Sequence, residues 1–377
     1  MNLITSESIT VGHPDKMCDL ISDSILTEYL KGDKDARVAC EVMATSKKVI
    51  VSGEITSKVK VDVLKIVRDT ITRIGYDNDD VGYNGHTIPI DILLNTQSPD
   101  ISMGVNKEEI GAGDQGLMFG YATNETDNFM PITLYYANKL SERLEFVRKN
   151  GVIPYLYPDG KTQVTFMFDD ENKPLYIDTI VVSIQHKDID IEVLRHDIKK
   201  YVIDEVIPRK YLVNDTKIYI NPTGRFVIGG PVGDTGLTGR KIIVDTYGGI
   251  IPHGGGAFSG KDYTKVDRTA AYYCRYVCKN IVASGLCNKL MISVSYAIGV
   301  SHPLSIYVDV FDNVEVKDKV MDVINKLFDF SPSNMINELN LKELDYRKTT
   351  CYSHFGKEDL PYEKLDKVRE IKKYLSI

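Results

Sequence analysis

Glycines, cations and carboxylates alternate in one part of the chain in a pattern that favours phosphate chemistry. The run from Gly229 to Lys241 holds five glycines in thirteen residues and ends in the adjacent cations Arg240 and Lys241. Cations alone would favour simple anion binding, whereas cations mixed with carboxylates favour a site for phosphate and metal together. Solvated surface charge is the alternative interpretation. The charged residues considered between positions 222 and 268 are Arg225, Arg240, Lys241, Lys261, Lys265, Arg268, Asp234, Asp262 and Asp267.

Two other glycine-rich segments match nucleotide-binding patterns without the usual context. Residues 255–262 have the G-x4-G-K frame of a Walker A loop, but Asp262 stands where a Ser or Thr hydroxyl would hold magnesium. Because an acid there would repel phosphate, we expect a backbone nest beside Lys261 rather than a Walker fold. Residues 111–116 match G-x-G-x-x-G, but the polar residues 106–109 precede them in place of a buried strand, which argues against a dinucleotide fold.

A helix near the start of the chain offers a second candidate anion site. Pro14 suits a first helical position, which makes His13 the predicted N-cap. The free N–H groups of the first turn, beside His13 and Lys16, would face outward and bind an anion. Asp15 would repel a phosphate there unless a cation such as Mg²⁺ lay between them. Alternatively, Asp15 only favours the positive end of the helix.

Two acids in predicted strands add a further indication of cation binding. Glu41 shares a strand face with Ala39 and Met43, and Glu54 shares one with Ile50. If buried, these carboxylates need a partner or a cation, and solvent exposure is the alternative. The other histidines have no metal-ligand spacing, and no nucleophile signature is present, so nothing favours covalent catalysis.

The elements that must position these residues follow a strand–strand–helix pattern that occurs three times. The helix starts are roughly 125–130 residues apart, which is too far for a solenoid and suits three repeated subdomains. Each unit would pack one face of a sheet under helices, which predicts an α+β fold. A further strand-like segment, 242–245, is expected behind the glycine run. The units are predicted at 37–44, 49–56 and 59–74; at 163–168, 177–185 and 191–206; and at 289–298, 305–311 and 316–328.

Length and composition predict a globular protein with more than one packed unit. The chain has 377 residues, 43% of them hydrophobic, and a formal net charge of −7. This acidic balance argues against a general nucleic-acid surface, so a polyanion would have to meet locally gathered cations or metal ions. Six isolated cysteines predict reduced thiols. With no signal-peptide pattern and no apolar run of membrane length, we expect no membrane association and a cytoplasmic location.

Five motifs, in order, resemble those of the S-adenosylmethionine synthetases, or methionine adenosyltransferases. The resemblance begins at Thr5 and covers essentially the whole chain, and its two longer motifs are very specific. The motifs are GHPDK at 12–16, GAGDQGLMFGYATNET at 111–126, NPTGRF at 221–226, the run 229–241 and GGGAFSGKD at 254–262.

The resemblance implies three similar subdomains with pseudo-threefold symmetry, at 1–98, 112–227 and 229–366, and a mobile active-site loop at 97–111. It implies a homotetramer built from tight dimers, with active sites shared across the dimer interface. The implied reaction converts ATP, L-methionine and water into S-adenosylmethionine, pyrophosphate and phosphate. Two Mg²⁺ ions per site and K⁺ are the implied cofactors.

The resemblance also assigns roles to residues at matching positions. The implied catalytic residues are His13, Lys161, Lys241 and Lys261. The implied ATP contacts are His13, Asp114, Asp159, Lys161, Arg225, Phe226, Asp234, Arg240, Lys241, Ala257 and Lys261. The implied methionine contacts are Glu54, Gln97, Asp234 and Lys265. The implied metal ligands are Asp15 and Asp267 for Mg²⁺ and Glu41 for K⁺.

The implied chemistry explains these residue types. Methionine sulfur is a neutral nucleophile that attacks C5′ of ATP, so this step needs no general base. The departing triphosphate gains negative charge, which preorganised cations and His13 would stabilise. Two positions depart from the family pattern: Ser102-Met103 in the loop, where Ala or Asn followed by Gln is common, and Tyr362, where tryptophan is frequent. Rival interpretations are a kinase-like enzyme with a disguised Walker loop and a catalytically silent nucleotide-binding subunit.

Overall fold

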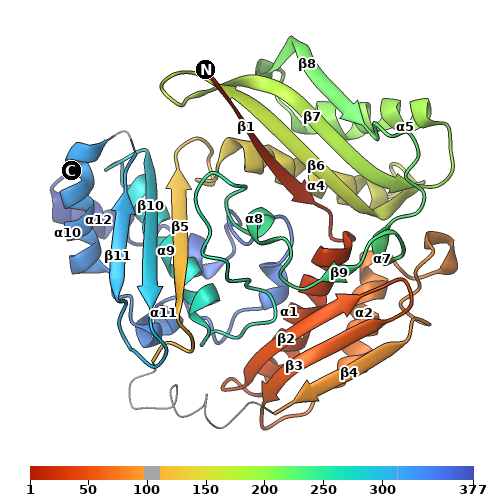
Figure 1. The fold of residues 1–377 in the computed structure, drawn as a ribbon. Coiled ribbons are helices and arrows are strands. Elements are labelled where there is room, and N and C mark those ends of the chain that lie inside the picture. Colours follow the sequence, from red (N-terminus) through yellow and green to blue (C-terminus); the bar gives the residue numbers. More distant parts are fainter. Residues whose placement is uncertain (97–110, 312) are drawn as a thin grey trace.

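Three β-sheets, each covered on one face by helices, make up the protein in a computed structural model that describes residues 1–96, 111–311 and 313–377 (Figure 1). The expected active-site loop at 97–111 therefore lies almost wholly outside the described residues, and Gln97 lies outside them too. The mixture of sheets and packed helices confirms the α+β class. No helix in the described ranges is long and apolar enough to cross a lipid bilayer.

The first sheet has the strand order β1-β6-β7-β8 and packs against helices α4 and α5. Its strands are β1 (Asn2–Ile9), β6 (Leu156–Phe168), β7 (Pro174–His186) and β8 (Leu212–Ile220). Its helices are α4 (Ile132–Lys149) and α5 (Ile191–Ile198), and α5 continues through a π-helical turn (Lys199–Ile203) into α6 (Asp204–Val206). Alternate residues of β6, such as Val164 and Phe166, are buried beneath α4, because successive strand side chains point to opposite faces.

The second sheet, β4-β3-β2-β9, lies over helices α1 and α2. Its strands are β2 (Arg37–Ala44), β3 (Val49–Thr56), β4 (Ile90–Asn95) and the short β9 (Gly236–Leu237). Helix α1 spans Pro14–Gly32 and helix α2 spans Val63–Ile74. Helix α2 begins four residues later than predicted because the side chain of Asp62 accepts the N–H of Lys65 and caps the helix there.

The third sheet, β11-β10-β5, packs mainly against the buried helix α9. Its strands are β5 (Gly116–Thr123), β10 (Lys289–Tyr296) and β11 (Ser305–Asp309). Its helices are α9 (Val266–Ala283), α10 (Lys317–Leu327), α11 (Pro332–Glu338) and α12 (Val368–Leu375). The six cysteines are free thiols, and Cys274 and Cys278 are both buried in α9.

Each sheet contains one strand from a distant part of the chain. Strand β1 pairs with β6, β5 pairs with β10, and β9 pairs with β2, all in antiparallel fashion. These long-range pairings connect the three predicted strand–strand–helix units to one another. They also bring the glycine-rich run, which contains the short helices α7 (Gly230–Gly233) and α8 (Ile242–Asp245), against α1.

The prediction of a strand at 242–245 is wrong, because this segment forms helix α8. Its β-branched residues favour a strand, but a tertiary contact decides the local structure. The N–H of Asp245 bonds to the carbonyl of Lys241, and its carboxylate turns inward to the buried ammonium of Lys16. The segment therefore closes into a single helical turn.

Candidate functional site

The start of α1 confirms the predicted helix cap and determines the protonation state of the capping histidine. His13 is the N-cap residue, and its Nδ1 accepts the N–H of Asp15 at 3.2 Å. Burial, followed by the nearby positive charge of Lys241, lowers the pKa of His13 to about 3. The ring is therefore neutral near pH 7. Since Nδ1 is an acceptor, the ring proton lies on Nε2, which can donate to an incoming anion.

Asp15 is almost completely buried at the centre of a group of cations. Its Oδ1 accepts the N–H of Leu237 at 3.0 Å, and its Oδ2 lies 2.5 Å from Nζ of Lys241. Nε of Arg240 lies 3.5 Å from Oδ1. Burial alone would raise the pKa of Asp15, but the hydrogen bonds from Lys241 and Leu237 outweigh it and the pKa is lowered. The acid thus stays ionised and holds both cations.

Strand β6 brings two further expected residues to the same place. Nζ of Lys161 lies 3.6 Å from a carboxylate oxygen of Glu7 on β1, and its side chain is 44% exposed. Asp159 accepts the N–H of Gly230 at 2.7 Å and is nearly buried. Burial, together with the negative charge of Asp234, raises the pKa of Asp159 to about 6. We refer to the six residues as the His13 cluster: His13, Asp15, Asp159, Lys161, Arg240 and Lys241.

A second group of expected residues gathers around the other glycine-rich loop. Nζ of Lys261 lies 2.6 Å from Oδ2 of Asp267, at the start of α9. Lys261 also pairs with Ala39 of β2 as an isolated antiparallel bridge, which places it near Glu41. Burial and then the charge of Glu54 raise the pKa of Glu41. We call this group the Lys261 cluster: Glu41, Glu54, Lys261, Lys265 and Asp267.

The two clusters are separate within one chain. Among the described residues, no hydrogen bond or ion pair joins a member of one cluster to a member of the other. Asp15 belongs to the first, whereas Asp23 accepts the N–H of Gly260, next to Lys261. Asp15 and Asp23 are eight residues apart on α1, or about 12 Å along a helix that rises 1.5 Å per residue. The charged residues between positions 222 and 268 therefore contribute to two clusters rather than to one.

One other expectation changes. Lys16 does not face outward beside a phosphate site, because it is fully buried between Asp19 and Asp245. The argument against a Walker loop is supported, since Asp262 is fully buried and accepts the N–H of Val38 at 2.7 Å. Of the two alternatives for Glu41 and Glu54, solvent exposure holds, since both side chains are exposed on the outer face of their sheet, although the Glu41 carboxylate has lost part of its hydration.

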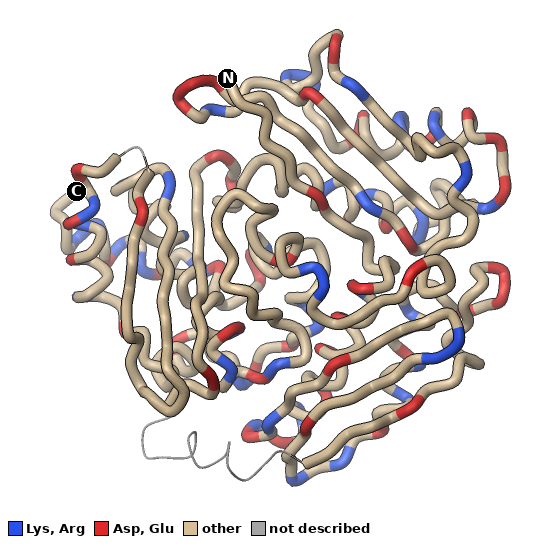
Figure 2. Tube along the Cα trace, viewed as in Figure 1, with Lys and Arg blue, Asp and Glu red and all other residues tan. Residues whose placement is uncertain are grey.

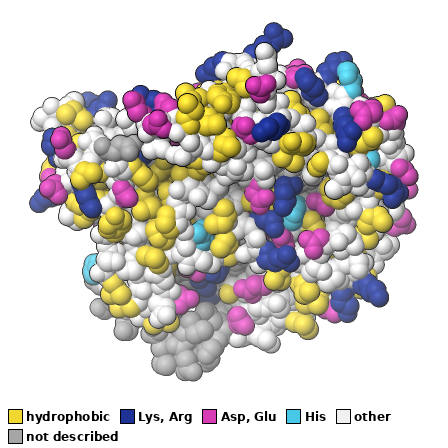
Figure 3. Space-filling view, turned by 45° about the horizontal axis from the view of Figure 1, so that its top comes forward, with side chains coloured by type: hydrophobic (Ala, Val, Ile, Leu, Met, Phe, Trp, Pro, Cys, Tyr) yellow, Lys and Arg dark blue, Asp and Glu magenta, His cyan; other side chains and the backbone are white. Residues whose placement is uncertain are grey.

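Charged side chains of both signs meet where the glycine-rich run passes the start of α1. In Figure 2, cationic and acidic positions lie close together in the centre of the view, along the chain that leads to α8. In Figure 3, cationic, acidic and histidine side chains gather on the surface in the same central region. A protein of net charge −7 therefore presents a local cation group on this face.

Three family models match consecutive parts of the chain. They describe the N-terminal domain of S-adenosylmethionine synthetase over residues 1–99, its central domain over 109–226 and its C-terminal domain over 228–364. The chain belongs to the S-adenosylmethionine synthetase family. Proteins named S-adenosylmethionine synthase are similar to it over nearly their full length. That of Clostridium botulinum is 52% identical over 99% of this chain and 99% of its own length. That of Clostridium tetani is 54% identical over 98% of both chains. That of Staphylococcus epidermidis is 51% identical over 100% of this chain and 98% of its own length.

Several other residues that the family resemblance singled out are not members of either cluster, although the charge of Asp234 acts on Asp159 and Ala257 lies close to Gly239. Arg225 is exposed, and its guanidinium lies 3.4 Å from Asp188. Phe226 is half-buried and donates its N–H to His186. Asp114 and Asp234 are both exposed. Ala257 is half-buried in the glycine-rich loop before Lys261.

The metal-binding residues expected from the family fit ions that bind together with substrate. In the described ranges no three His, Cys, Asp or Glu side chains gather into a metal cage. Mg²⁺ commonly binds through one or two carboxylates plus substrate phosphates and water. Asp15 and Asp267 each supply one carboxylate beside a lysine, which suits such an arrangement. Glu41 and Glu54 place two carboxylates close enough to repel each other, and a cation would relieve that repulsion.

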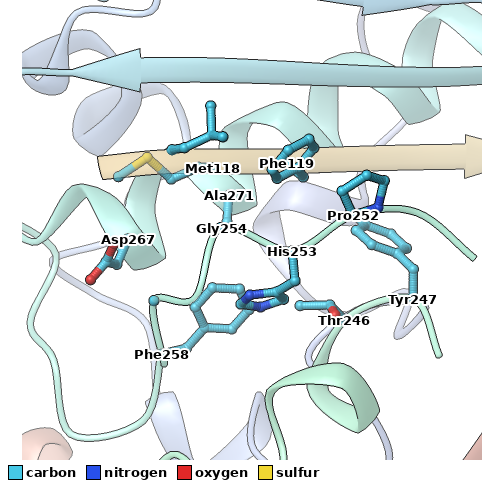
Figure 4. A pocket seen from close by; sticks show the side chains of 12 residues that line it. Met118, Phe119, Thr246, Tyr247, Pro252, His253, Gly254, Phe258, Asp267 and Ala271 are labelled. Atoms are coloured by element: carbon cyan, nitrogen blue, oxygen red, sulfur yellow. The ribbon is translucent and has the colours of Figure 1, made fainter. Parts of the chain in front are cut away.

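A pocket beside Asp267 was missed by the sequence reasoning. Figure 4 shows it between β5 and the segment that leads to Phe258, with Asp267 at its edge. The ring of His253 lies 6.4 Å from that of Phe258, and its Nδ1 accepts the N–H of Gly255. The only signal in the sequence is the position of His253 directly before the three glycines 254–256. The pocket extends the Lys261 cluster with apolar surface.

Proposed function

We propose that this chain synthesises S-adenosylmethionine by attack of the methionine sulfur on C5′ of ATP, followed by hydrolysis of the bound triphosphate to pyrophosphate and phosphate. The observation that carries the proposal is the His13 cluster, in which a neutral histidine stands beside Arg240 and Lys241 on a buried carboxylate. Such a preorganised site stabilises negative charge on a substrate, and it does not supply a nucleophile or a general base. Family membership supports the two substrates.

The arrangement of the cluster suits a leaving group that gains charge. The Nε2–H of His13 would donate to the oxygen released from C5′, while Lys161 and Lys241 hold the triphosphate chain. These donors are held in place before the reaction, so their reorientation costs little at the transition state. By analogy with an oxyanion hole, loss of one such donor costs roughly 2.7–4 kcal/mol of transition-state stabilisation. The same cations would then assist hydrolysis of the triphosphate.

The remaining ATP contacts in the proposal come from both ends of the glycine-rich region. Lys261 would hold the triphosphate from the second cluster, and its pairing with Asp267 keeps its ammonium oriented. The other ATP contacts carried over from the family are Asp114, Asp159, Arg225, Phe226, Asp234 and Ala257. Methionine would contact Glu54, Gln97, Asp234 and Lys265, of which Lys265 is fixed by an ion pair with Asp262.

Two Mg²⁺ ions, with Asp15 and Asp267 as ligands, would neutralise phosphate charge when bound. K⁺ would be held by Glu41. The exposed position of Glu41 near Glu54 and Lys261 supports a role in balancing charge between these groups. Lys241 and Lys261 pair with the same carboxylates that the metals would share.

We further propose that two copies of the chain complete each active site, as the dimer of dimers implied by the family would allow. The support is the separation of the two clusters, since one triphosphate needs the cations of both. The outer face of the second sheet carries exposed apolar side chains beside Glu41, including Met43 and Leu93. Apolar side chains are also spread over the face seen in Figure 3.

The domain ranges 1–98, 112–227 and 229–366, and their pseudo-threefold relation, belong to this proposal. The support is that each range contains one strand–strand–helix unit. The exchanged strands β1, β5 and β9 connect the units. The cytoplasm is the expected location.

One incubation tests the proposed reaction. Purified protein is supplied with ATP, L-methionine, MgCl₂ and KCl, and the products are separated by chromatography. S-adenosylmethionine with both pyrophosphate and phosphate is the expected result. Release of ADP without methionine would instead support the kinase-like alternative, and no turnover would support a silent subunit.

The role of His13 is tested by the variant His13→Ala. We expect synthesis to be abolished while hydrolysis of added tripolyphosphate is less affected, because only the first step releases an oxygen from carbon. The matched control is His196→Ala, since His196 is exposed on α5, away from both clusters. Equal loss of both activities in His13→Ala would contradict the leaving-group role.

A further inference from the structure

One face of α1 carries three aspartates at successive helical turns, and each accepts a backbone N–H from a glycine-rich segment. Asp15 takes the N–H of Leu237 at 3.0 Å. Asp19 takes that of Gly239 at 2.8 Å, and Asp23 takes that of Gly260 at 2.9 Å. The spacing of four residues places the three side chains in one row. The row thus ties both glycine-rich segments to the same helix.

Asp19 differs from Asp15 because it is inaccessible to any substrate. Its side chain is 0% exposed, as is that of Lys16, whose Nζ lies 2.9 Å from Oδ2 of Asp19. Lys16 also bonds to the carboxylate of Asp245, which is 3% exposed. An ionised carboxylate in the core is costly unless it is paired and hydrogen-bonded.

The pairing leaves one acid in excess. Two buried carboxylates face one ammonium, so Lys16 would be neutralised by either acid alone. Burial is the main cause that raises the pKa of Asp245 to about 7. Neutralisation of Lys16 therefore explains one of the two carboxylates, Asp19 or Asp245, but not the presence of both.

The reason for both lies in what the two acids hold. Asp19 bonds to Gly239, the residue directly before Arg240 and Lys241. Asp245 lies one helical turn after Lys241, and its own N–H bonds to the Lys241 carbonyl. The buried ammonium between them therefore joins the two ends of the short segment that carries both cations.

We propose that Asp19, Lys16 and Asp245 form a buried clamp whose role is to position Arg240 and Lys241 against the triphosphate. The inference rests on the proposed function, because it assigns these two cations to the substrate. Asp19 is a positioning residue, since it touches neither substrate nor reacting atoms. It acts through the backbone of Gly239.

The variant Asp19→Asn tests the clamp. It keeps the size of the side chain and an oxygen for the Gly239 N–H, but it removes the ion pair between Asp19 and Lys16, which opens the clamp. Lys16 stays paired with Asp245, so the fold is expected to persist. We expect binding of inorganic tripolyphosphate, measured by calorimetry with Mg²⁺, to weaken about tenfold. The matched control is Ser24→Ala on the same helix, because within the described residues the buried Ser24 hydroxyl bonds only to the Leu20 carbonyl.

A double-mutant cycle separates positioning from general stability. In a Lys241→Met background, Asp19→Asn should weaken tripolyphosphate binding less than about threefold, because the group that it positions is absent. In a Lys261→Met background, the full factor of about ten should remain. Equal factors in all three backgrounds would overturn the clamp. If Asp19→Asn does not fold, the same cycle is measured with Asp245→Asn, which leaves Lys16 paired with Asp19. The same results would then support or overturn the clamp.

The test remains distinct from that of the proposed function. Tripolyphosphate binding needs no synthesis, so a wild-type protein that binds tripolyphosphate and makes no S-adenosylmethionine would overturn the function alone. A wild-type protein that makes S-adenosylmethionine but shows no coupling between Asp19 and Lys241 would overturn the clamp alone.

Discussion

Asp159 is predicted to reduce the stability of the substrate-free protein, so Asp159→Asn should stabilise it. The carboxylate is nearly buried, and its pKa is raised from 3.8 to about 6, first by burial and then by Asp234. Each pKa unit corresponds to about 1.4 kcal/mol, so this rise corresponds to about 3 kcal/mol. The amide in the variant carries no charge and can still accept the N–H of Gly230.

The sign of the pH dependence follows from proton binding. Between pH 3.8 and about 6 the folded protein binds more protons at Asp159 than the unfolded chain does, so the stability of the wild type falls as the pH rises through this window. Above it, the full difference of about 3 kcal/mol from the variant is present. Below pH 3.8 the acid is protonated in both states, and the difference disappears.

Differential scanning calorimetry at a fixed protein concentration measures this effect. With an unfolding entropy of about 0.8 kcal/mol/K for 377 residues, the variant should melt about 4 °C above the wild type at pH 7.5. The gain should shrink steadily toward pH 4.5. Asp215→Asn, at an exposed position on β8, is the control and should change little. A variant that melts lower at pH 7.5, or a gain that does not depend on pH, would refute the reasoning.

Three other changes test the glycine-rich loop and the core. Asp262→Thr restores a Walker-like sequence, yet we expect no methionine-independent ATPase activity. The free energy of unfolding should fall by roughly 3–5 kcal/mol, because a buried charge pair is broken. A gain in ATPase activity would contradict this. Gly260→Ala should abolish synthesis and lower the melting temperature, since φ is +81° and the new Cβ would lie 1.9 Å from the Cys40 carbonyl oxygen. Gly151→Ala shares the backbone strain, at φ +66°, but meets no atom within 4 Å and should leave activity unchanged. Glu363→Gln should cost about 3–5 kcal/mol and reduce the wild-type loss of stability below pH 4.5, because one buried carboxylate with a lowered pKa is then absent. Thermal melting from pH 3 to 7 measures this change.

The strand–strand–helix units were predictable because alternation and helical spacing are local properties of the sequence. In β2, every second residue from Val38 to Ala44 is buried, as the pattern predicts. The pairing of β1 with β6 was not predictable in this way, since 152 positions separate Ile9 from its partner Lys161 in the register. Local periodicity contains no information about which distant strand completes a sheet.

The same limit explains the errors at individual residues. Lys16 lies in the first turn of α1 near a predicted anion site, and a local argument places its ammonium in solvent. Its burial depends on Asp245, which is 229 positions away. The strand expected at 242–245 fails for the same reason, because that contact turns the segment inward. The cations Arg240 and Lys241 were recognisable from their glycine-rich setting, but the division of the site into two clusters depends on where each glycine-rich segment meets α1, at Asp15 or at Asp23.

The position of the buried acids explains how an acidic protein can hold a polyanion. Asp15, Asp19 and Asp23 lie beneath the glycine-rich segments, each bonded to a backbone N–H and to a cation. A paired acid contributes little repulsion to a phosphate on the far side of its cation, and it fixes the direction of that cation. Acidic residues at these positions therefore organise the positive surface rather than weaken it. It follows that neutralising a buried acid, although it raises the net charge, should weaken triphosphate binding, whereas neutralising an exposed acid such as Asp188 should not.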